Sequence, residues 1–157
     1  MTDHDRQSAN QAGAPAAAPS PYPDYGPPIS LASAKKVIAA AEAEAARNGW
    51  PMTIAVLDST ANLVLLERMD QANLGSLAVA QQKAETAVKF RQPTKVYDDL
   101  IAKGGVALRI LSIPSIVAIE GGIPLTSNGR VVGSIGVSGM SPTQDALVAQ
   151  AGAAALT

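Results

Sequence analysis

Apolar residues recur at helical spacing early in the chain. In the stretch LASAKKVIAAAEAEAARNG, residues 31–49, leucine, isoleucine and alanine return every three or four positions, which places them on one face of a helix. Ser30 is a residue type that caps helix starts. Asn48 and Gly49 favour the left-handed backbone conformation that ends helices. The pattern predicts a helix between these two signals.

Two short apolar runs follow this helix, MTIAVLD at 52–58 and LVLLERMD at 63–70. Both have the length and composition of strands. The residues between them, Ser59 to Asn62, form a tight polar turn in which the asparagine tolerates a positive φ. The sequence therefore predicts a β-hairpin after the first helix.

The remaining segments are predicted to form two helices, a strand and a hairpin strand. Residues 76–90 and 94–103 have helical spacing, and the apolar run SIVAIEGG at 115–122 is typical of a strand. A hairpin turn at Ser127, Asn128 and Gly129 leads into a further strand, RVVGSIGVSG. We expect four strands and four helices in total.

The last helix has the clearest start signal. Ser141 is a capping residue, Pro142 suits the first helical position, and Gln144 follows Ser141 by three residues, which together make a capping box. The complete order is α-β-β-α-α-β-β-α. This order predicts an α+β fold in which helices pack against an antiparallel sheet.

The first 28 residues differ from the rest in composition. They hold six of the 11 prolines and almost no large aliphatic side chains. Such a segment buries too little apolar surface to offset the entropy of ordering it. We expect residues 1–28 to be a flexible arm and residues 29–157 to be one domain. The alternative for the arm is that Tyr22 and Tyr25 pack on a neighbouring subunit.

Charge and composition exclude several classes of function. The net charge of −1 argues against a nucleic-acid-binding surface. The chain has no cysteine and a single histidine, His4, so thiol chemistry, histidine triads and the usual metal sites are not expected.

The start of the chain resembles no secretory signal and no apolar run is long enough for a membrane span, so we expect a cytoplasmic protein without membrane partners. The alanine-rich, aromatic-poor core favours a homo-oligomer.

The stretch GRVVGSIGVSGMSPTQD, residues 129–145, spaces three glycines by three positions. This spacing differs from nucleotide-binding motifs. One interpretation is that the glycines let another backbone pack close to the strand. The other is an anion site made by Ser138, Gly139 and the free amides at the start of the last helix.

A second group of candidate residues lies on the helix at 76–90. Lys83, Thr86 and Phe90 share one face, and Glu85 can pair with Lys89. This face is either solvated, with an ordinary ion pair, or it presents the Lys83 ammonium to a ligand carboxylate.

Arg68 and Asp70 lie at the end of a predicted strand. One interpretation is that these residues form an ordinary salt bridge with a neighbouring element. The other is that Arg68 makes a bidentate contact with a carboxylate.

Four separated motifs resemble one known family. AVLDSTANLVLLERMDQA, QQKAETAVKFRQPT, EGGIPL and GRVVGSIGVSGMSPTQDALVAQAGAAAL are similar, in this order, to motifs of the GlcG/HbpS-like family. Its members are also called haem-degrading domains and occur at the C-terminus of PduO-type proteins. The similarity spans residues 29–156.

The resemblance implies an antiparallel α+β domain with profilin-like layering that assembles into dimers and up to octamers. It also implies binding of haem or a corrinoid, or, in some pathways, hydrolysis of small acids. Lys83 and Thr86 fall where haem-binding relatives place ligand-contacting groups. Because the domain has no histidine, a haem would have to be held without histidine ligation. Its axial ligand would then be Met69, Met140, a tyrosine, a lysine or Thr86.

Two functions therefore remain. The first, which we favour, is an oligomeric protein that binds an anionic small molecule, such as haem or another tetrapyrrole. Its ligand-binding candidates are Arg68, Lys83, Thr86, Phe90, Ser138 and Gly139. The second is a hydrolase or related enzyme acting on a small carboxylic acid, with Asp70, Glu85, Glu120 or Asp145 as acid or base. We expect no metal site in either case.

Overall fold

A four-stranded antiparallel sheet forms the centre of the computed structural model, which describes residues 17–156. The strand order is β2-β1-β4-β3. Tight turns join β1 to β2 and β3 to β4, and the pairing of β1 with β4 brings the two halves of the chain together. The strands are β1 (Thr53–Asp58), β2 (Leu63–Arg68), β3 (Gly122–Ser127) and β4 (Arg130–Ser138).

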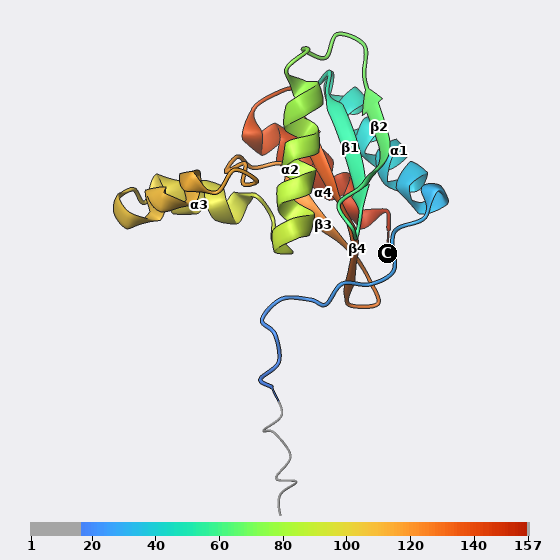
Figure 1. The fold of residues 1–157 in the computed structure, drawn as a ribbon. Coiled ribbons are helices and arrows are strands. Elements are labelled where there is room, and N and C mark those ends of the chain that lie inside the picture. Colours follow the sequence, from blue (N-terminus) through green and yellow to red (C-terminus); the bar gives the residue numbers. More distant parts are fainter. Residues whose placement is uncertain (1–16, 157) are drawn as a thin grey trace, which may run out of the picture.

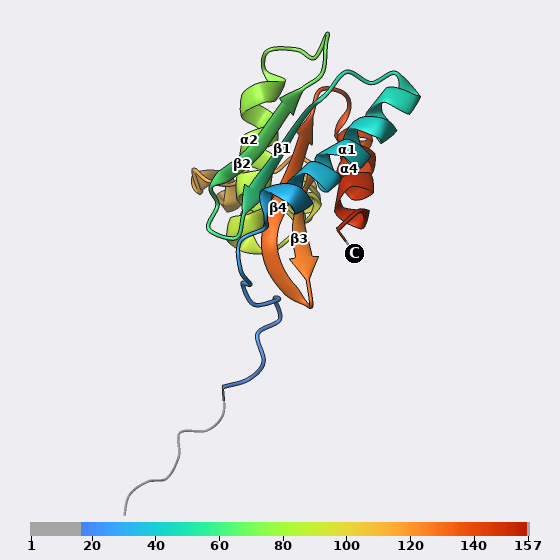
Figure 2. The same cartoon turned by 90° about the vertical axis from the view of Figure 1, so that its right-hand side faces the viewer.

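Helices cover both faces of this sheet (Figures 1 and 2). Helix α2 (Ser76–Phe90) lies on one face, and α1 (Leu31–Asn48) and α4 (Pro142–Ala154) lie together on the other. The larger apolar core fills the space between the sheet and the α1–α4 pair, and a smaller one lies beneath α2. The predicted α+β fold with flanking helices is confirmed.

The α3–η1 arm, residues 95–112, projects from this body (Figure 1). It consists of α3 (Lys95–Ala102) and a 3-10 helix, η1 (Gly105–Ser112). Tyr97 is the one buried residue of α3, and η1 has none. The arm is therefore much less anchored than the other helices. The sequence pattern predicted α3 but not η1.

Local signals placed most elements correctly. Ser30 accepts a hydrogen bond from the Ser33 N–H at the start of α1, and Gly49 ends the helix with a φ of 69°. The hairpin turn between β1 and β2 differs in one detail, because Ala61, with a φ of 65°, takes the positive φ expected of Asn62. The Asp58 carboxylate fixes this turn by accepting the N–H groups of Thr60 and Asn62.

The strand expected at 115–122 is wrong. Residues 115–121 form an irregular segment, and β3 begins only at Gly122. The Thr86 hydroxyl accepts the N–H of Val117 at 2.9 Å and donates to the Ser115 carbonyl at 3.0 Å. These bonds to α2 hold the apolar run outside the sheet ladder.

The last residues of the predicted arm at 1–28 contact the domain. Asp24, Gly26 and Ile29 each form a backbone hydrogen bond of 2.8 Å with Val131 or Val132 of β4. The domain contacts therefore begin ahead of the boundary expected at residue 28. Residues 1–16, which include His4, lie outside the described residues.

Tyr22 and Tyr25 pack within their own chain. The guanidinium carbon of Arg91 lies 5.5 Å and 5.1 Å from the centres of their rings. The Tyr25 hydroxyl donates to the carbonyls of Val88 and Lys89 near the end of α2. The two tyrosines thus tie the N-terminal segment to α2, whereas the sequence left a contact with a neighbouring subunit open.

Candidate functional site

The three evenly spaced glycines allow close packing. A Cβ atom at Gly136 would collide with the Ala80 carbonyl of α2, and one at Gly133 with the Leu57 carbonyl of β1. A Cβ at Gly139 would lie 2.6 Å from the Pro51 carbonyl oxygen. Of the two interpretations of this stretch, the geometry favours the packing one.

The start of α4 carries a carboxylate from the chain itself. The capping box is confirmed, since Ser141 accepts the Gln144 N–H and Gln144 in turn accepts the Ser141 N–H. The N–H of Met140 donates to Asp145 Oδ1 at 3.0 Å. The Asp145 carboxylate thus takes the amide expected to bind a ligand anion beside Ser138 and Gly139. Binding of a ligand anion by Ser138, Gly139 and the amides at the start of α4 stays a prediction.

Lys83 and Asp145 form an ion pair in the interior. Their side chains are 1% and 3% exposed, and Lys83 Nζ lies 2.7 Å from Asp145 Oδ2 and 3.0 Å from the Val137 carbonyl oxygen. Burial raises the pKa of the Asp145 carboxyl, and the Lys83 ammonium and the Met140 N–H oppose this rise. The two sequence interpretations placed Lys83 either on a solvated helix face or at an open ligand surface. The structure instead places it in a buried ion pair.

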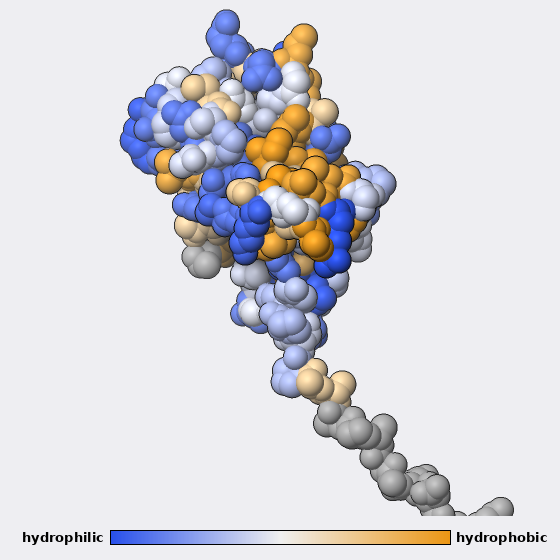
Figure 3. All heavy atoms as spheres, turned by 90° about the vertical axis from the view of Figure 1, so that its left-hand side faces the viewer, coloured by the Kyte–Doolittle hydropathy of each residue, from blue (hydrophilic) through white to orange (hydrophobic). Residues whose placement is uncertain are grey.

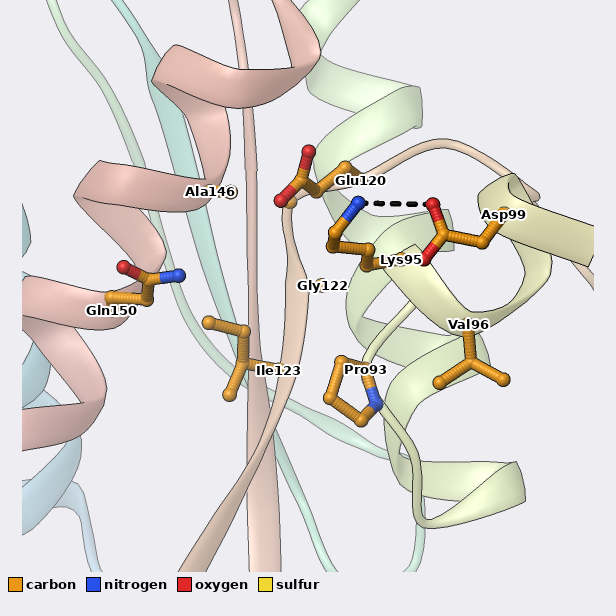
Figure 4. A pocket seen from close by; sticks show the side chains of 10 residues that line it. Pro93, Lys95, Val96, Asp99, Glu120, Gly122, Ile123, Ala146 and Gln150 are labelled. Atoms are coloured by element: carbon orange, nitrogen blue, oxygen red, sulfur yellow. Dashed lines mark hydrogen bonds and ion pairs between the residues drawn. The ribbon is translucent and has the colours of Figure 1, made fainter. Parts of the chain in front are cut away.

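A cavity of about 460 Å³ lies between α3, the start of β3 and α4 (Figure 4). Lys95 Nζ, at its edge, donates to Asp99 Oδ1 at 2.9 Å. The hydrogen bond to Asp99 raises the pKa of Lys95, as do the negative charges of Asp99, Glu120 and Asp98. The lining residues are Pro93, Lys95, Val96, Asp99, Glu120, Gly121, Gly122, Ile123, Ala146 and Gln150.

Gly121 and Gly122 form a wall of this cavity, and hydrogen bonds fix both. The Gly121 carbonyl accepts the Val137 N–H at 2.9 Å, and the N–H of Gly122 donates to the Thr94 hydroxyl at 2.9 Å. A Cβ atom at Gly121 would lie 2.8 Å from Lys83 Nζ. The buried ion pair is therefore directly behind the cavity wall.

The other candidates on α2 do not line this cavity. Thr86 is buried and holds the 115–117 segment. The Phe90 ring packs edge-to-face against the Tyr97 ring, with centroids 5.7 Å apart. Glu85 forms a surface ion pair with Lys89, as the spacing predicted. All three side chains therefore contact other parts of the protein and not the cavity.

Arg68 and Asp70 lie away from the cavity. Both are exposed at the end of β2, an edge strand that is separated from β3 by two other strands. Asp70 lines a different hollow of about 300 Å³, together with Trp50 and Met69. Of the four carboxylates considered for catalysis, Glu120 is the one that lines the cavity.

Sequence reasoning missed most of the cavity residues. Lys95, Asp99 and Gln150 carry no distinctive spacing, and Ile123 belongs to a strand that was predicted too early in the chain. The glycine pair at 121–122 was the one signal available. The sequence pattern places this pair at the end of a strand, and not in a cavity wall.

The cavity fits a haem in part. Its apolar side chains suit a flat macrocycle, and Lys95 suits a propionate. However, histidine, cysteine, methionine and tyrosine, which are the usual iron ligands, are absent from its lining. Met69 lies in the other hollow, and Met140 is an exposed residue before α4. A haem here would therefore be held by its propionates and by apolar packing against its macrocycle, without one of these iron ligands.

Residues 17–156 contain neither a cluster of metal ligands nor a membrane-spanning helix. No group of three or more histidine, aspartate or glutamate side chains in this range is arranged to hold a metal ion. Within the same range, no helix combines the length and the apolar character needed to cross a bilayer.

The chain belongs to the HbpS-like family. The model of this family, described as haem degrading protein HbpS-like, matches residues 29–154. The chain is 38% identical to the protein GlcG of Escherichia coli K12 over 110 residues, which is 70% of this chain and 81% of GlcG. It is 31% identical to the corrinoid adenosyltransferase PduO of Salmonella typhimurium over 108 residues, or 68% of this chain, and this match spans 32% of PduO.

Solved structures support the assignment of the chain to the HbpS-like family. A double mutant of HbpS from Streptomyces reticuli superimposes with a TM-score of 0.77 and 34% identity, covering 93% of this chain and 99% of that one. A PduOC:heme complex superimposes with a TM-score of 0.74 and 28% identity, covering 82% and 94%.

Proposed function

We propose that the protein binds an anionic, largely apolar small molecule in the cavity beside Gly121, with haem as the representative to test. The single observation that carries this proposal is a cavity of about 460 Å³ with an apolar wall and the Lys95 ammonium at its edge. Small-molecule sites typically enclose about 300–1,000 Å³ and combine apolar walls with a few polar groups.

The charges around the cavity define how such a ligand would bind. Lys95 is the cation among the lining residues, and Asp99 and Glu120 are the anions. A ligand carboxylate would share the Lys95 ammonium with Asp99, because an ammonium has three N–H donors and Asp99 Oδ1 accepts one of them. Asp99 and Glu120 would oppose it by repulsion. The haem of the PduOC complex supports the choice of ligand class.

Titration with haemin, followed through its Soret band, tests this proposal. Lys95→Met should weaken binding about tenfold or more, corresponding to about 1.4 kcal/mol, and Glu120→Gln should tighten it. Lys36→Met, an exposed lysine of α1 outside the cavity lining, is the matched control and should leave the affinity unchanged. The dimethyl ester of haemin should not distinguish Lys95→Met from the parent protein. Absence of saturable binding, or tighter binding by Lys95→Met, would contradict the proposal.

The enzyme alternative rests on the position of Glu120. This carboxylate lines the cavity and is half-buried, so it can reach a bound acid as a proton donor or acceptor. Glu120→Gln separates the two functions: it should abolish turnover of a hydrolysable acid if Glu120 acts in catalysis. Tighter haemin binding without any turnover by the parent protein would support binding alone.

We also propose that the protein works as an assembly of several copies, between a dimer and an octamer. The apolar α3–η1 arm supports this, because its helices bury one residue between them within the single chain.

A further inference from the structure

The charged groups that line the cavity beside Gly121 are not equivalent. Lys95 Nζ donates to Asp99 Oδ1 at 2.9 Å, so these two charges compensate each other. Glu120 differs, because within residues 17–156 its side chain forms neither an ion pair nor a hydrogen bond. The cavity lining therefore has one negative charge without a partner, and this charge belongs to the half-buried Glu120.

Glu120 is fixed close to Lys95. The Glu120 N–H donates to Asp98 Oδ2 of α3 at 3.1 Å, which ties the residue in front of the glycine wall to the helix that carries Lys95. The pKa of Lys95 is raised by the hydrogen bond and the charge of Asp99 and then by the charge of Glu120. Figure 4 shows both side chains at the same end of the cavity. A ligand that contacts both must hold its anionic and cationic groups close together.

The remainder of the cavity lining suits an apolar group. Pro93, Val96, Ile123 and Ala146 supply apolar side chains beside the charged end. On the side of the molecule that carries α3, apolar residues gather beside hydrophilic ones (Figure 3). Removing an apolar group of the ligand from water against these side chains favours binding. The fitting ligand is therefore charged at one end and apolar at the other.

Charge complementarity distinguishes three kinds of ligand with such an apolar body. A simple carboxylate gains Lys95 but brings a second negative charge beside Glu120. A simple amine gains Glu120 but leaves the other N–H donors of Lys95 without a ligand partner. A ligand with both groups gives Lys95 a carboxylate and Glu120 an ammonium, and both contacts are charge-assisted hydrogen bonds. In an α-amino acid, one carbon atom carries both groups and the side chain.

We propose that the cavity binds an α-amino acid with a large apolar side chain, whose carboxylate contacts Lys95 and whose ammonium contacts Glu120. This inference rests on the proposed function, because it uses the same cavity and the same Lys95 contact. It adds a cationic group to the ligand and gives Glu120 a partner. Glu120 then favours the correct ligand and opposes acids that lack the ammonium group.

Three probes with the same apolar body test the inference on the full-length parent protein, namely phenylalanine, 3-phenylpropanoate and 2-phenylethylamine. Isothermal titration calorimetry measures their affinities. Phenylalanine should bind about fivefold or more tightly than either of the other two, because each of them lacks one charge-assisted contact. Phenylalanine should also displace haemin, followed through the Soret band, because both ligands need Lys95.

Substitutions assign the two contacts. Glu120→Gln should weaken phenylalanine about fivefold or more and should not weaken 3-phenylpropanoate, although the same change should tighten haemin. Lys95→Met should weaken both acids and should not weaken 2-phenylethylamine. Glu85→Gln is the matched control, because Glu85 lies on α2 outside the lining of this cavity, and it should leave all three affinities unchanged. Circular dichroism checks the fold of each variant.

The outcomes separate this inference from the proposed function. If haemin binds but phenylalanine binds no more tightly than 3-phenylpropanoate, the inference is overturned and the proposed function stands. Phenylalanine that binds without displacing haemin, or that binds equally well to Glu120→Gln, would also overturn it. A parent protein that binds neither haemin nor any of the three probes would overturn both. The probe series on the parent protein decides the matter even where a variant does not fold.

Discussion

The Lys83 ammonium lies 2.7 Å from the Asp145 carboxylate in the interior of the protein, directly behind the glycine wall of the cavity. Lys83 comes from α2 on one face of the sheet and Asp145 from the first turn of α4 on the other. The pair therefore joins the two helix layers at the end of β4. Each member of the pair also has a neutral hydrogen-bonding partner. Lys83 donates to the Val137 carbonyl, and Asp145 accepts the Met140 N–H.

Lys83→Met should destabilise the fold by about 3–5 kcal/mol, because it leaves the Asp145 carboxylate buried without its charge partner. Thermal or denaturant unfolding measures the loss. Adding Asp145→Asn, which keeps an oxygen for the Met140 N–H, should restore most of it. A Lys83→Met single variant as stable as the parent protein would show that the pair contributes nothing.

Gly136→Ala should destabilise the protein by about 1–3 kcal/mol or more, since the added methyl group would force α2 away from β4. Gly75→Ala is the matched control. It has a φ of −63° and an ordinary neighbour distance of 3.5 Å, so the change should be neutral or slightly stabilising. Urea unfolding compares the two. Equal effects would remove the packing explanation for the glycine.

Tyr25→Phe should cost about 0.5–1.5 kcal/mol, because the lost hydroxyl donates to the Val88 and Lys89 carbonyls. Tyr22→Phe is its control, since the ring stays against Arg91 and the described residues give its hydroxyl no hydrogen bond. Thermal unfolding of both variants tests whether the N-terminal segment contributes to the stability of the domain. Identical transitions for Tyr25→Phe and the parent protein would indicate that it does not.

Glu67→Gln should make stability less dependent on pH. Burial raises the pKa of Glu67 above 4.5, and the neighbouring Glu42 carboxyl raises it further by repulsion and by a hydrogen bond. A raised pKa in the folded state means that the stability contribution is complete below pH 4.5 and is lost as the pH rises through the folded-state pKa. The glutamine variant should therefore melt above the parent protein at neutral pH, with little difference near pH 4.

Melting curves at both pH values, with Glu85→Gln on the surface as the control, check this prediction. The control should change little, because exposed ion pairs such as that of Glu85 with Lys89 contribute about 0–1 kcal/mol. A Glu67→Gln variant that melts below the parent protein at pH 7 would contradict it.

Local patterns in the sequence determined the α-helices and most strands, but not the 3-10 helix η1. Helical spacing, the Ser30 cap and the Gly49 stop define α1 within the chain's own neighbouring residues, and the Ser141 capping box does the same for α4. The SIVAI run shows where this reasoning fails. Its composition suits a strand, but the Thr86 hydroxyl, some 30 positions away in the sequence, takes the backbone groups that a ladder would need.

The site depended on contacts that no local pattern encodes. The sequence identified Lys83 and Asp145 separately, as a ligand group and an acid, but their burial and pairing follow from two helices meeting across the end of the sheet. Lys95 and Glu120 stand 25 positions apart and come together because α3 and the start of β3 border one cavity. Helix caps and spacing are determined by neighbours in the chain, so the sequence alone determined them. Charge pairing and cavity shape depend on which distant segments pack together, so only the tertiary structure decided them.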